Sequence, residues 1–180
     1  MQQKARSFAI EAHGEQKYGE RPYLYHLDAV AALAAPYGSE AETVAYLHDT
    51  AEDTLTTLEE IGQLFGPRIA ACVALLTDEP GTNRKERKAT TYAKLAKVHG
   101  PNELALVVKV ADRLANVRAC VMDHKRDLWE LYLSEHQVFR KSAYRTGLCE
   151  ALWIELDSLL SKGGFVEREA EPFHRGDIKR

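Results

Sequence analysis

Apolar side chains recur every three to four residues along most of the chain, which is the spacing of one face of an α-helix. Ala5, Phe8, Ala9 and Ala12 form one such stripe near the amino end. No segment alternates apolar and polar residues well enough to predict a strand. The pattern therefore predicts an all-α fold, a helical bundle of about eight or more helices.

Glycine, proline and capping residues divide this pattern into separate helices. Ser39 with Glu42, and Thr57 with Glu60, have the spacing of a capping box, in which side chains bond the free amides at a helix start. The expected helices span residues 2–13, 25–35, 39–53, 57–66, 67–76, 84–99, 101–117, 126–144 and 148–161, with loops at residues 14–22 and 78–83.

The length of 180 residues fits one domain, because domains run about 100–200 residues. No linker or repeat divides the chain, so we expect one domain over residues 1–164 and a charged, loosely ordered tail over residues 165–180. The longest apolar run, Ile69–Leu76, is much shorter than the roughly 20 residues that span a bilayer. The first residues do not resemble a secretory signal, so a cytoplasmic location is expected.

The net charge of −3 points to neither nucleic acid nor an anionic membrane as a partner. Cys72, Cys120 and Cys149 lack the spacing of a disulfide framework or a zinc ribbon, and are expected to be reduced core thiols. Charge is unevenly placed, since residues 23–66 contain eight acids and no Lys or Arg, and a basic segment follows at residues 84–97. Solvated helix faces of opposite sign would also explain both runs.

Four ionisable side chains gather in one short stretch, His48, Asp49, Glu52 and Asp53. Residues three and four apart share a helix face, so these groups are expected to crowd one helical turn. Their carboxylates would repel one another unless a cation neutralised them. Imidazole and carboxylate suit Mn, Fe or Zn, but one turn cannot surround an ion, so other helices must supply ligands.

His26 and Asp112 are the candidates for those further ligands. Asp112 lies within an otherwise apolar helix face, where an unpaired carboxylate is expensive to bury. Together with His48 and Asp49, the two would form a site open to water, as catalytic metal sites are. Taken alone, a histidine such as His26 is more often a surface or capping residue, and an aspartate such as Asp112 is more often a salt-bridge partner within its helix. For Lys109, one turn from Asp112, we favour an ion pair over a phosphate contact.

The order of these residues resembles the HD superfamily of metal-dependent phosphohydrolases, and within it the hydrolase domain of RelA/SpoT homologues and the stand-alone small alarmone hydrolases. The resemblance covers roughly residues 4–122, and rests on PYLYH (22–26), YLHDTAEDT (46–54), TLEEIGQLFG (57–66) and VKVADRLANVR (108–118). It implies an HD-domain bundle in which one manganese ion is bound by His26, His48, Asp49 and Asp112. It also implies acid/base roles for Glu52 and Asp53, and places Asn116 beside the substrate and the attacking water.

The same resemblance implies hydrolysis of the 3′-pyrophosphate of (p)ppGpp, giving GDP or GTP and pyrophosphate. The residues leave open an adenine alarmone such as ppApp, a nucleoside monophosphate or another phosphate ester. A non-catalytic nucleotide sensor is the alternative outside enzymes. Assembly into a homo-oligomer is also left open by the sequence.

Two positions differ from well-studied relatives, which carry an Arg-Lys pair about nine residues before the first metal-binding His. Lys17 and Tyr18 occupy those positions here, so Tyr18 could stack on a base and Lys17 could bind a phosphate. Ala119 stands where many relatives carry Thr. The expected substrate-binding residues are Lys17, Tyr18, Tyr23, Arg84 and Lys88.

Overall fold

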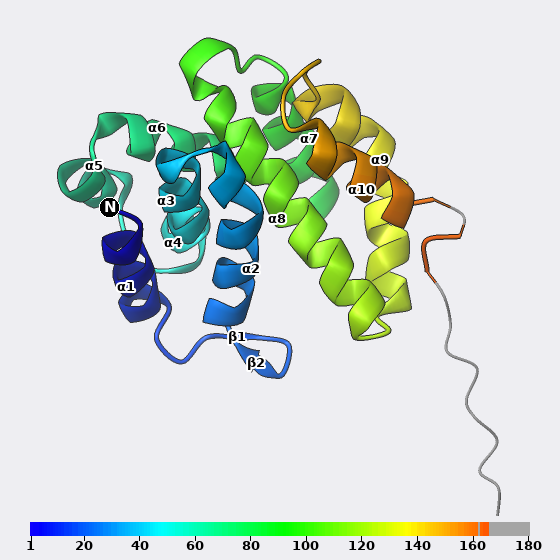
Figure 1. Cartoon of the computed structure of the whole chain (residues 1–180), viewed down its shortest axis with the longest axis horizontal. Coiled ribbons are helices and arrows are strands. Elements are labelled where there is room, and N and C mark those ends of the chain that lie inside the picture. The colour runs from blue at the N-terminus through cyan, green and yellow to red at the C-terminus, as the bar shows by residue number, and fades with distance from the viewer. Residues whose placement is uncertain (162, 166–180) are drawn as a thin grey trace, which may run out of the picture.

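The computed structural model describes residues 1–161 and 163–165. Helices make up nearly all of its regular structure, so the prediction of an all-α bundle is confirmed (Figure 1). The helices are α1 (Gln2–His13), α2 (Leu24–Ala34), α3 (Ser39–Leu47), α4 (Thr50–Asp53), α5 (Leu58–Phe65), α6 (Pro67–Leu76), α7 (Arg84–Leu95), α8 (Glu103–Met122), α9 (Arg126–Ala143) and α10 (Glu150–Leu159), with short 3-10 turns at Ala35–Tyr37 and Gly100–Asn102. Apart from Phe165, the predicted tail lies outside the described residues.

The long helix α8 lies in the middle of the fold, between the amino-terminal helices and the carboxyl-terminal pair α9 and α10 (Figure 1). It contacts α2, α3 and α6 as well as α9 and α10. Such an environment requires apolar side chains around most of the helix, and Leu106, Val110, Leu114 and Val117 are all fully buried. A polar side chain on α8 is therefore held firmly by the core.

The residues expected to form one helix over 39–53 form two, α3 and α4, separated by His48 and Asp49. At this break the Thr50 hydroxyl donates to the Leu47 carbonyl at 2.7 Å. Side-chain bonds of this kind compete with the helical pattern of the backbone. The break could not be predicted from the spacing of apolar residues, because the apolar stripe continues without interruption up to it.

The two predicted capping boxes have different outcomes. The Thr57 side chain accepts a hydrogen bond from the Glu60 amide at the start of α5, as predicted. The Ser39 prediction is wrong, because Ser39 is the first residue of α3, and Gly38, at a φ of 109°, takes the cap position. Ser39 instead accepts, through its carbonyl, a bond from the Thr43 hydroxyl.

A small antiparallel hairpin lies within the predicted loop at residues 14–22. Its strands are β1 (Lys17–Tyr18) and β2 (Arg21–Pro22), and Tyr18 pairs with Arg21. Two residues per strand are too few to leave an alternating pattern, which explains why no strand was predicted. The Arg21 guanidinium binds both carboxylate oxygens of Asp123 at 2.7 Å, and so ties the hairpin to the end of α8.

None of the helices in the described part of the chain combines the length and the hydropathy that crossing a membrane would require.

Candidate metal centre

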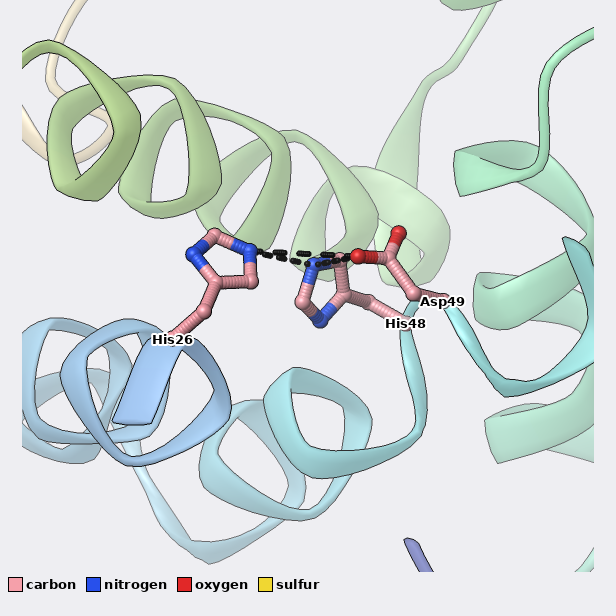
Figure 2. Close-up of side chains that lie close together, drawn as sticks. All are labelled: His26, His48 and Asp49. Carbon is pink, nitrogen blue, oxygen red and sulfur yellow. Dashed lines mark hydrogen bonds and ion pairs between the residues drawn. The ribbon is translucent and has the colours of Figure 1, made fainter. Parts of the chain in front are cut away.

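Four side chains from three parts of the chain meet beside α8. His26 comes from α2, His48 and Asp49 from the break between α3 and α4, and Asp112 from α8. His26, His48 and Asp49 offer ligand atoms within 4.8 Å of one another, and Figure 2 shows the three converging. Asp112 Oδ1 lies 3.4 Å from His26 Nε2 and 3.8 Å from His48 Nε2. The structure therefore brings together all four residues expected to be metal ligands.

The helix break explains how two adjacent residues reach the same point. Neighbouring side chains on a continuous α-helix point about 100° apart around its axis. His48 ends α3 and Asp49 precedes α4, and His48 Nε2 lies 2.9 Å from Asp49 Oδ2. The same nitrogen is 3.3 Å from His26 Nε2.

The donor set fits a divalent transition metal. His48 Nδ1 donates to the Ala45 carbonyl at 2.7 Å, so in the neutral imidazole Nε2 keeps its lone pair and directs it into the cluster. Two imidazole nitrogens and two carboxylate oxygens suit ions such as Mn, Fe or Zn. The cluster could therefore hold a divalent metal ion.

The electrostatics of the cluster also favour a cation. Burial disfavours a charged His48, but the carboxylates of Asp49 and Asp112 outweigh burial and raise the pKa of His48 to about 10. Burial likewise opposes ionisation of both aspartates, yet the pKa of Asp49 is lowered, chiefly by His48, and that of Asp112 is lowered, chiefly by Lys109. The pocket thus attracts positive charge, which a proton or a metal ion can supply.

Asp112 is held from two sides. Lys109 Nζ lies 3.5 Å from Asp112 Oδ2 and donates to the Leu76 carbonyl, so the favoured ion pair is present. On the other side, the Asn116 amide nitrogen donates to Asp112 Oδ1 at 2.6 Å. Asp112 therefore turns Oδ1 toward the histidines while Oδ2 faces the lysine.

Asp49, Glu52 and Asp53 share the first turn of α4, because the Asp49 carbonyl accepts from the amides of Glu52 at 3.1 Å and Asp53 at 2.9 Å. His48 lies outside this turn, at the end of α3, so the prediction that all four side chains crowd one helical turn is wrong for His48. Glu52 accepts a hydrogen bond from the Asp78 amide at 2.8 Å. Asp53 Oδ2 lies 3.2 Å from the Tyr23 hydroxyl, which donates to Asp49 Oδ2 at 2.5 Å. Tyr23 thus links the cluster to Asp53.

The aromatic residues around His26 form a packed group. The Tyr18 ring stacks on His26 with centroids 4.8 Å apart and an interplanar angle of 14°. The Tyr18 hydroxyl donates to Asn116 Oδ1 at 2.8 Å. Lys17, next to it on β1, is exposed.

A cavity of about 220 Å³ opens beside His26, between α2 and α8. Most of its lining is apolar, and Ala119, the position where many relatives carry Thr, is part of it. The lining residues are Tyr18, Tyr25, His26, Ala29, Leu33, Ala115, Arg118, Ala119 and Met122.

Arg84 and Lys88 are held by acidic partners. The Arg84 guanidinium binds Glu135 of α9 at 2.8 Å, and Lys88 Nζ lies 2.7 Å from Asp78 Oδ2. The Lys88 contact leads to Glu52, because the Asp78 amide donates to Glu52, whereas Arg84 is tied to α9. Their role in substrate binding stays a prediction.

Two residues near the site, Asp78 and His13, were not singled out by sequence analysis. Asp78 joins Glu52 to Lys88, and was expected only to start a loop. His13 is buried at the end of α1, where its ring stacks on Tyr23 at 4.4 Å. An acidic residue directly after an apolar helix was the available signal for Asp78; we find none for His13.

The family described as HD domain matches residues 5–149, and the chain belongs to this family. It is 36% identical over 150 residues to a guanosine-3′,5′-bis(diphosphate) 3′-pyrophosphohydrolase of Aquifex aeolicus, covering 81% of this chain and 21% of that protein. It is also 36% identical over 124 residues to guanosine-3′,5′-bis(diphosphate) 3′-pyrophosphohydrolase MESH1 of Xenopus tropicalis, covering 64% of this chain and 66% of that protein. The predicted relationship to the hydrolase domains of RelA/SpoT homologues is thereby confirmed.

Other relatives are much longer. A GTP pyrophosphokinase rsh of Brucella abortus is 39% identical over 121 residues, covering 64% of this chain and 16% of that protein. The chain thus spans about a fifth or less of its long relatives. Among solved structures, a metazoan orthologue of SpoT that hydrolyses ppGpp superposes with a TM-score of 0.74 at 24% identity, covering 87% of this chain and 92% of that one. This likeness concerns the fold.

Proposed function

We propose that the protein is a metal-dependent hydrolase that removes the 3′-pyrophosphate of (p)ppGpp, giving GDP or GTP and pyrophosphate. The observation that carries the proposal is the convergence of His26, His48, Asp49 and Asp112 in a chain similar to named 3′-pyrophosphohydrolases. A degenerate nucleotide sensor has no need for so crowded a set of charges, which argues against the non-catalytic alternative.

The four clustered residues would hold the ion, for which we propose Mn²⁺. When bound, such an ion polarises the phosphate and makes water a better nucleophile. Asp112 is kept in place for this task by Lys109 and Asn116, which bond its two oxygens separately. His48 is oriented by its bond to the Ala45 carbonyl.

Glu52 and Asp53 would move the proton. Burial raises the pKa of Glu52, and Asp49 adds to the rise, while the Asp78 amide and Lys109 oppose it. A carboxylate with a raised pKa accepts a proton more readily near neutral pH, as a general base requires. Asn116 would orient water or a ribose hydroxyl, since Asp112 and Tyr18 hold its amide.

The cavity beside His26 would receive the nucleoside, with the exposed Lys17 near its phosphates and Tyr23 near the cluster. Arg84 and Lys88 would contact distal phosphates by exchanging their carboxylate partners for phosphate oxygens. Arg84 is an attractive phosphate ligand because guanidinium binds phosphate in a bidentate manner.

An adenine alarmone such as ppApp is a second candidate substrate, because the cavity lining offers few groups that would distinguish adenine from guanine. The Tyr18 hydroxyl is occupied by Asn116, and Arg118 binds both carboxylate oxygens of Glu155 at 2.6 Å. The remaining lining side chains are mostly apolar. A site that offers few free hydrogen-bonding groups discriminates weakly between purines.

The test is a manganese-supplemented assay with ppGpp, ppApp, GMP and AMP, in which chromatography identifies the leaving group. We expect pyrophosphate from the two tetraphosphates and no release from the monophosphates. His48→Asn should abolish release, and His99→Asn, at an exposed histidine, should keep it. Orthophosphate as the product would contradict the proposal, and nucleotide binding without any product would favour a sensor.

A further inference from the structure

The hairpin β1–β2 places one aromatic side chain against both halves of the metal cluster. Tyr18 touches His26 of α2 through its ring and Asn116 of α8 through its hydroxyl. We propose that Tyr18 is a positioning residue, which fixes His26 by stacking and fixes Asp112 through Asn116. The measurement of turnover rests on the proposed function. The measurement of metal binding does not, because it needs no substrate.

The ring contact restricts rotation of His26. Tyr18 lies nearly parallel to the imidazole, and Tyr23 meets the same imidazole edge-on, with centroids 5.7 Å apart and an interplanar angle of 70°. The imidazole of His26 is thus packed against two tyrosine rings, which also contact each other with centroids 6.3 Å apart. Rotamers locked by packing hold ligand atoms close to the binding geometry, which reduces the entropy lost when an ion binds.

The hydroxyl contact holds the Asn116 amide in the direction that its bond to Asp112 requires. Because Tyr18 donates to Asn116 Oδ1, the Asn116 amide nitrogen must face the other way, toward Asp112 Oδ1. A flipped amide would turn its oxygen toward the Asp112 carboxylate, which only accepts, and would lose the bond to Asp112. Asp112 Oδ1 is the oxygen that lies 3.4 Å from His26 Nε2, so the hydroxyl acts on the cluster through a single intermediate residue.

The hairpin itself is fixed to the helix that carries Asp112. Arg21, which pairs with Tyr18 across the hairpin, binds both oxygens of Asp123, and its guanidinium lies 4.6 Å from the centre of the Tyr25 ring. The backbone of Tyr18 is therefore held relative to both α8 and α2. Such an anchor is what a residue that positions ligands from two helices requires.

The stack also limits the other role expected for Tyr18. One face of its ring is covered by His26, so a nucleobase could stack only on the opposite face. A residue that served the base alone would affect the Michaelis constant and leave metal binding unchanged. A positioning residue would affect metal binding even when no nucleotide is present.

Two substitutions separate the ring from the hydroxyl. Tyr18→Phe keeps the stack and removes the bond to Asn116, while Tyr18→Leu removes both. Tyr37→Phe is the matched control, because it removes a hydroxyl from a half-buried tyrosine in the 3-10 turn after α2. Mn²⁺ affinity is measured by calorimetric titration of each full-length variant without nucleotide, and kcat and KM are measured with ppGpp.

We expect Tyr18→Leu to weaken Mn²⁺ binding by about 10-fold to 100-fold, the range found when residues that orient metal ligands are replaced. Tyr18→Phe should weaken Mn²⁺ binding by about 3-fold and lower kcat about 10-fold at nearly constant KM. Tyr37→Phe should match the wild type. Circular dichroism checks folding, and Tyr18→Phe, which keeps the packed ring, carries the test if the leucine variant unfolds.

The proposal is overturned if both Tyr18 variants bind Mn²⁺ with the same affinity as the Tyr37→Phe control. If KM rises in that case, Tyr18 contacts the base of the nucleotide and does not position the metal ligands. If the Tyr18 variants bound Mn²⁺ more weakly and the wild-type protein released no pyrophosphate from ppGpp, the proposed function would be refuted and the positioning role would still be supported.

Discussion

Glu52 lies next to the cluster, where its neighbours act on its acidity in opposite directions. Burial and the charge of Asp49 raise its pKa, whereas the Asp78 amide and Lys109 lower it, and the net shift is upward. Glu52 bonds to the Asp78 amide. Among the described residues, it has no hydrogen bond to any of the four proposed ligands. A change at this side chain should therefore alter proton transfer without removing a ligand.

Glu52→Gln should lower kcat about 100-fold with little change in Mn²⁺ affinity, because a general base contributes roughly 10² to 10⁴ in rate. In the wild type, activity should fall as pH drops through the raised pKa of Glu52, since protonation removes the base. The variant should lose this acidic limb of the pH profile. Steady-state rates across pH, with metal content measured in parallel, provide the check; an unchanged limb would assign the base elsewhere.

At the level of single residues, the four clustered side chains were easier to predict from the sequence than the residues around them. His26 and Asp112 could be selected because their types and order match a known pattern, and the structure brings both to His48 and Asp49. The contacts of Tyr18 could not be predicted, because stacking on His26 and bonding to Asn116 depend on how a short hairpin lies against two helices. Pair distances of this kind are properties of the tertiary structure.

Glu135 on α9 joins three helices. It accepts hydrogen bonds from Arg84 of α7 and Arg113 of α8, and Tyr92 of α7 donates to it at 3.4 Å. Burial opposes its ionisation, but the two arginines outweigh burial and lower the pKa of Glu135. Arg113 is nearly buried as well, so loss of the carboxylate would leave an uncompensated charge inside the protein.

Glu135→Gln should destabilise the protein by about 2–3 kcal/mol at neutral pH, the size typical of lost charge-assisted bonds. The folded pKa is below the unfolded one, so the carboxylate stabilises the fold above the unfolded pKa and this contribution is lost as pH falls through the folded pKa. Thermal melting at neutral and acidic pH should show the gap between variant and wild type closing in acid.

The matched control for this prediction is Glu155→Gln. Glu155 also binds an arginine in a bidentate manner, but Arg118 and Glu155 are 48% and 41% exposed. Exposed pairs contribute about 0–1 kcal/mol. If the two variants lost the same free energy of unfolding, the larger effect expected at Glu135 could not be attributed to its burial.

At the level of elements, helices were predictable wherever their apolar stripe ended at a glycine, a proline or a capping residue. Thr57 marks the start of α5 through such a local bond. The break at His48 and Asp49 was missed because it depends on a hydroxyl of Thr50 bonding the backbone inside a continuous apolar pattern. This break is also where the site differs from prediction, since it separates Glu52 from His48.

For the whole molecule, the cluster joins α2, the α3–α4 break and α8, which are distant in sequence. An ion bound there would hold these parts together only in the folded state, because the unfolded chain has no preformed site. Binding should therefore appear as added stability.

Manganese at 100 times its dissociation constant should stabilise the folded protein by about 2.7 kcal/mol. Thermal melting with and without Mn²⁺ should show this as a rise in melting temperature that a chelator reverses. His48→Asn should abolish the rise and His99→Asn should keep it. A rise of equal size in His48→Asn would place the ion outside the proposed cluster.

The position of Asp112 in α8 also has a consequence for biosynthesis. A nascent chain that leaves the ribosome presents both imidazoles and Asp49 long before it presents α8, and domains generally fold only once their segments have emerged. The proposed set of four donors is therefore complete only after α8 has emerged. A product truncated before α8 would keep three of the four donors and lack the helix against which they are arranged.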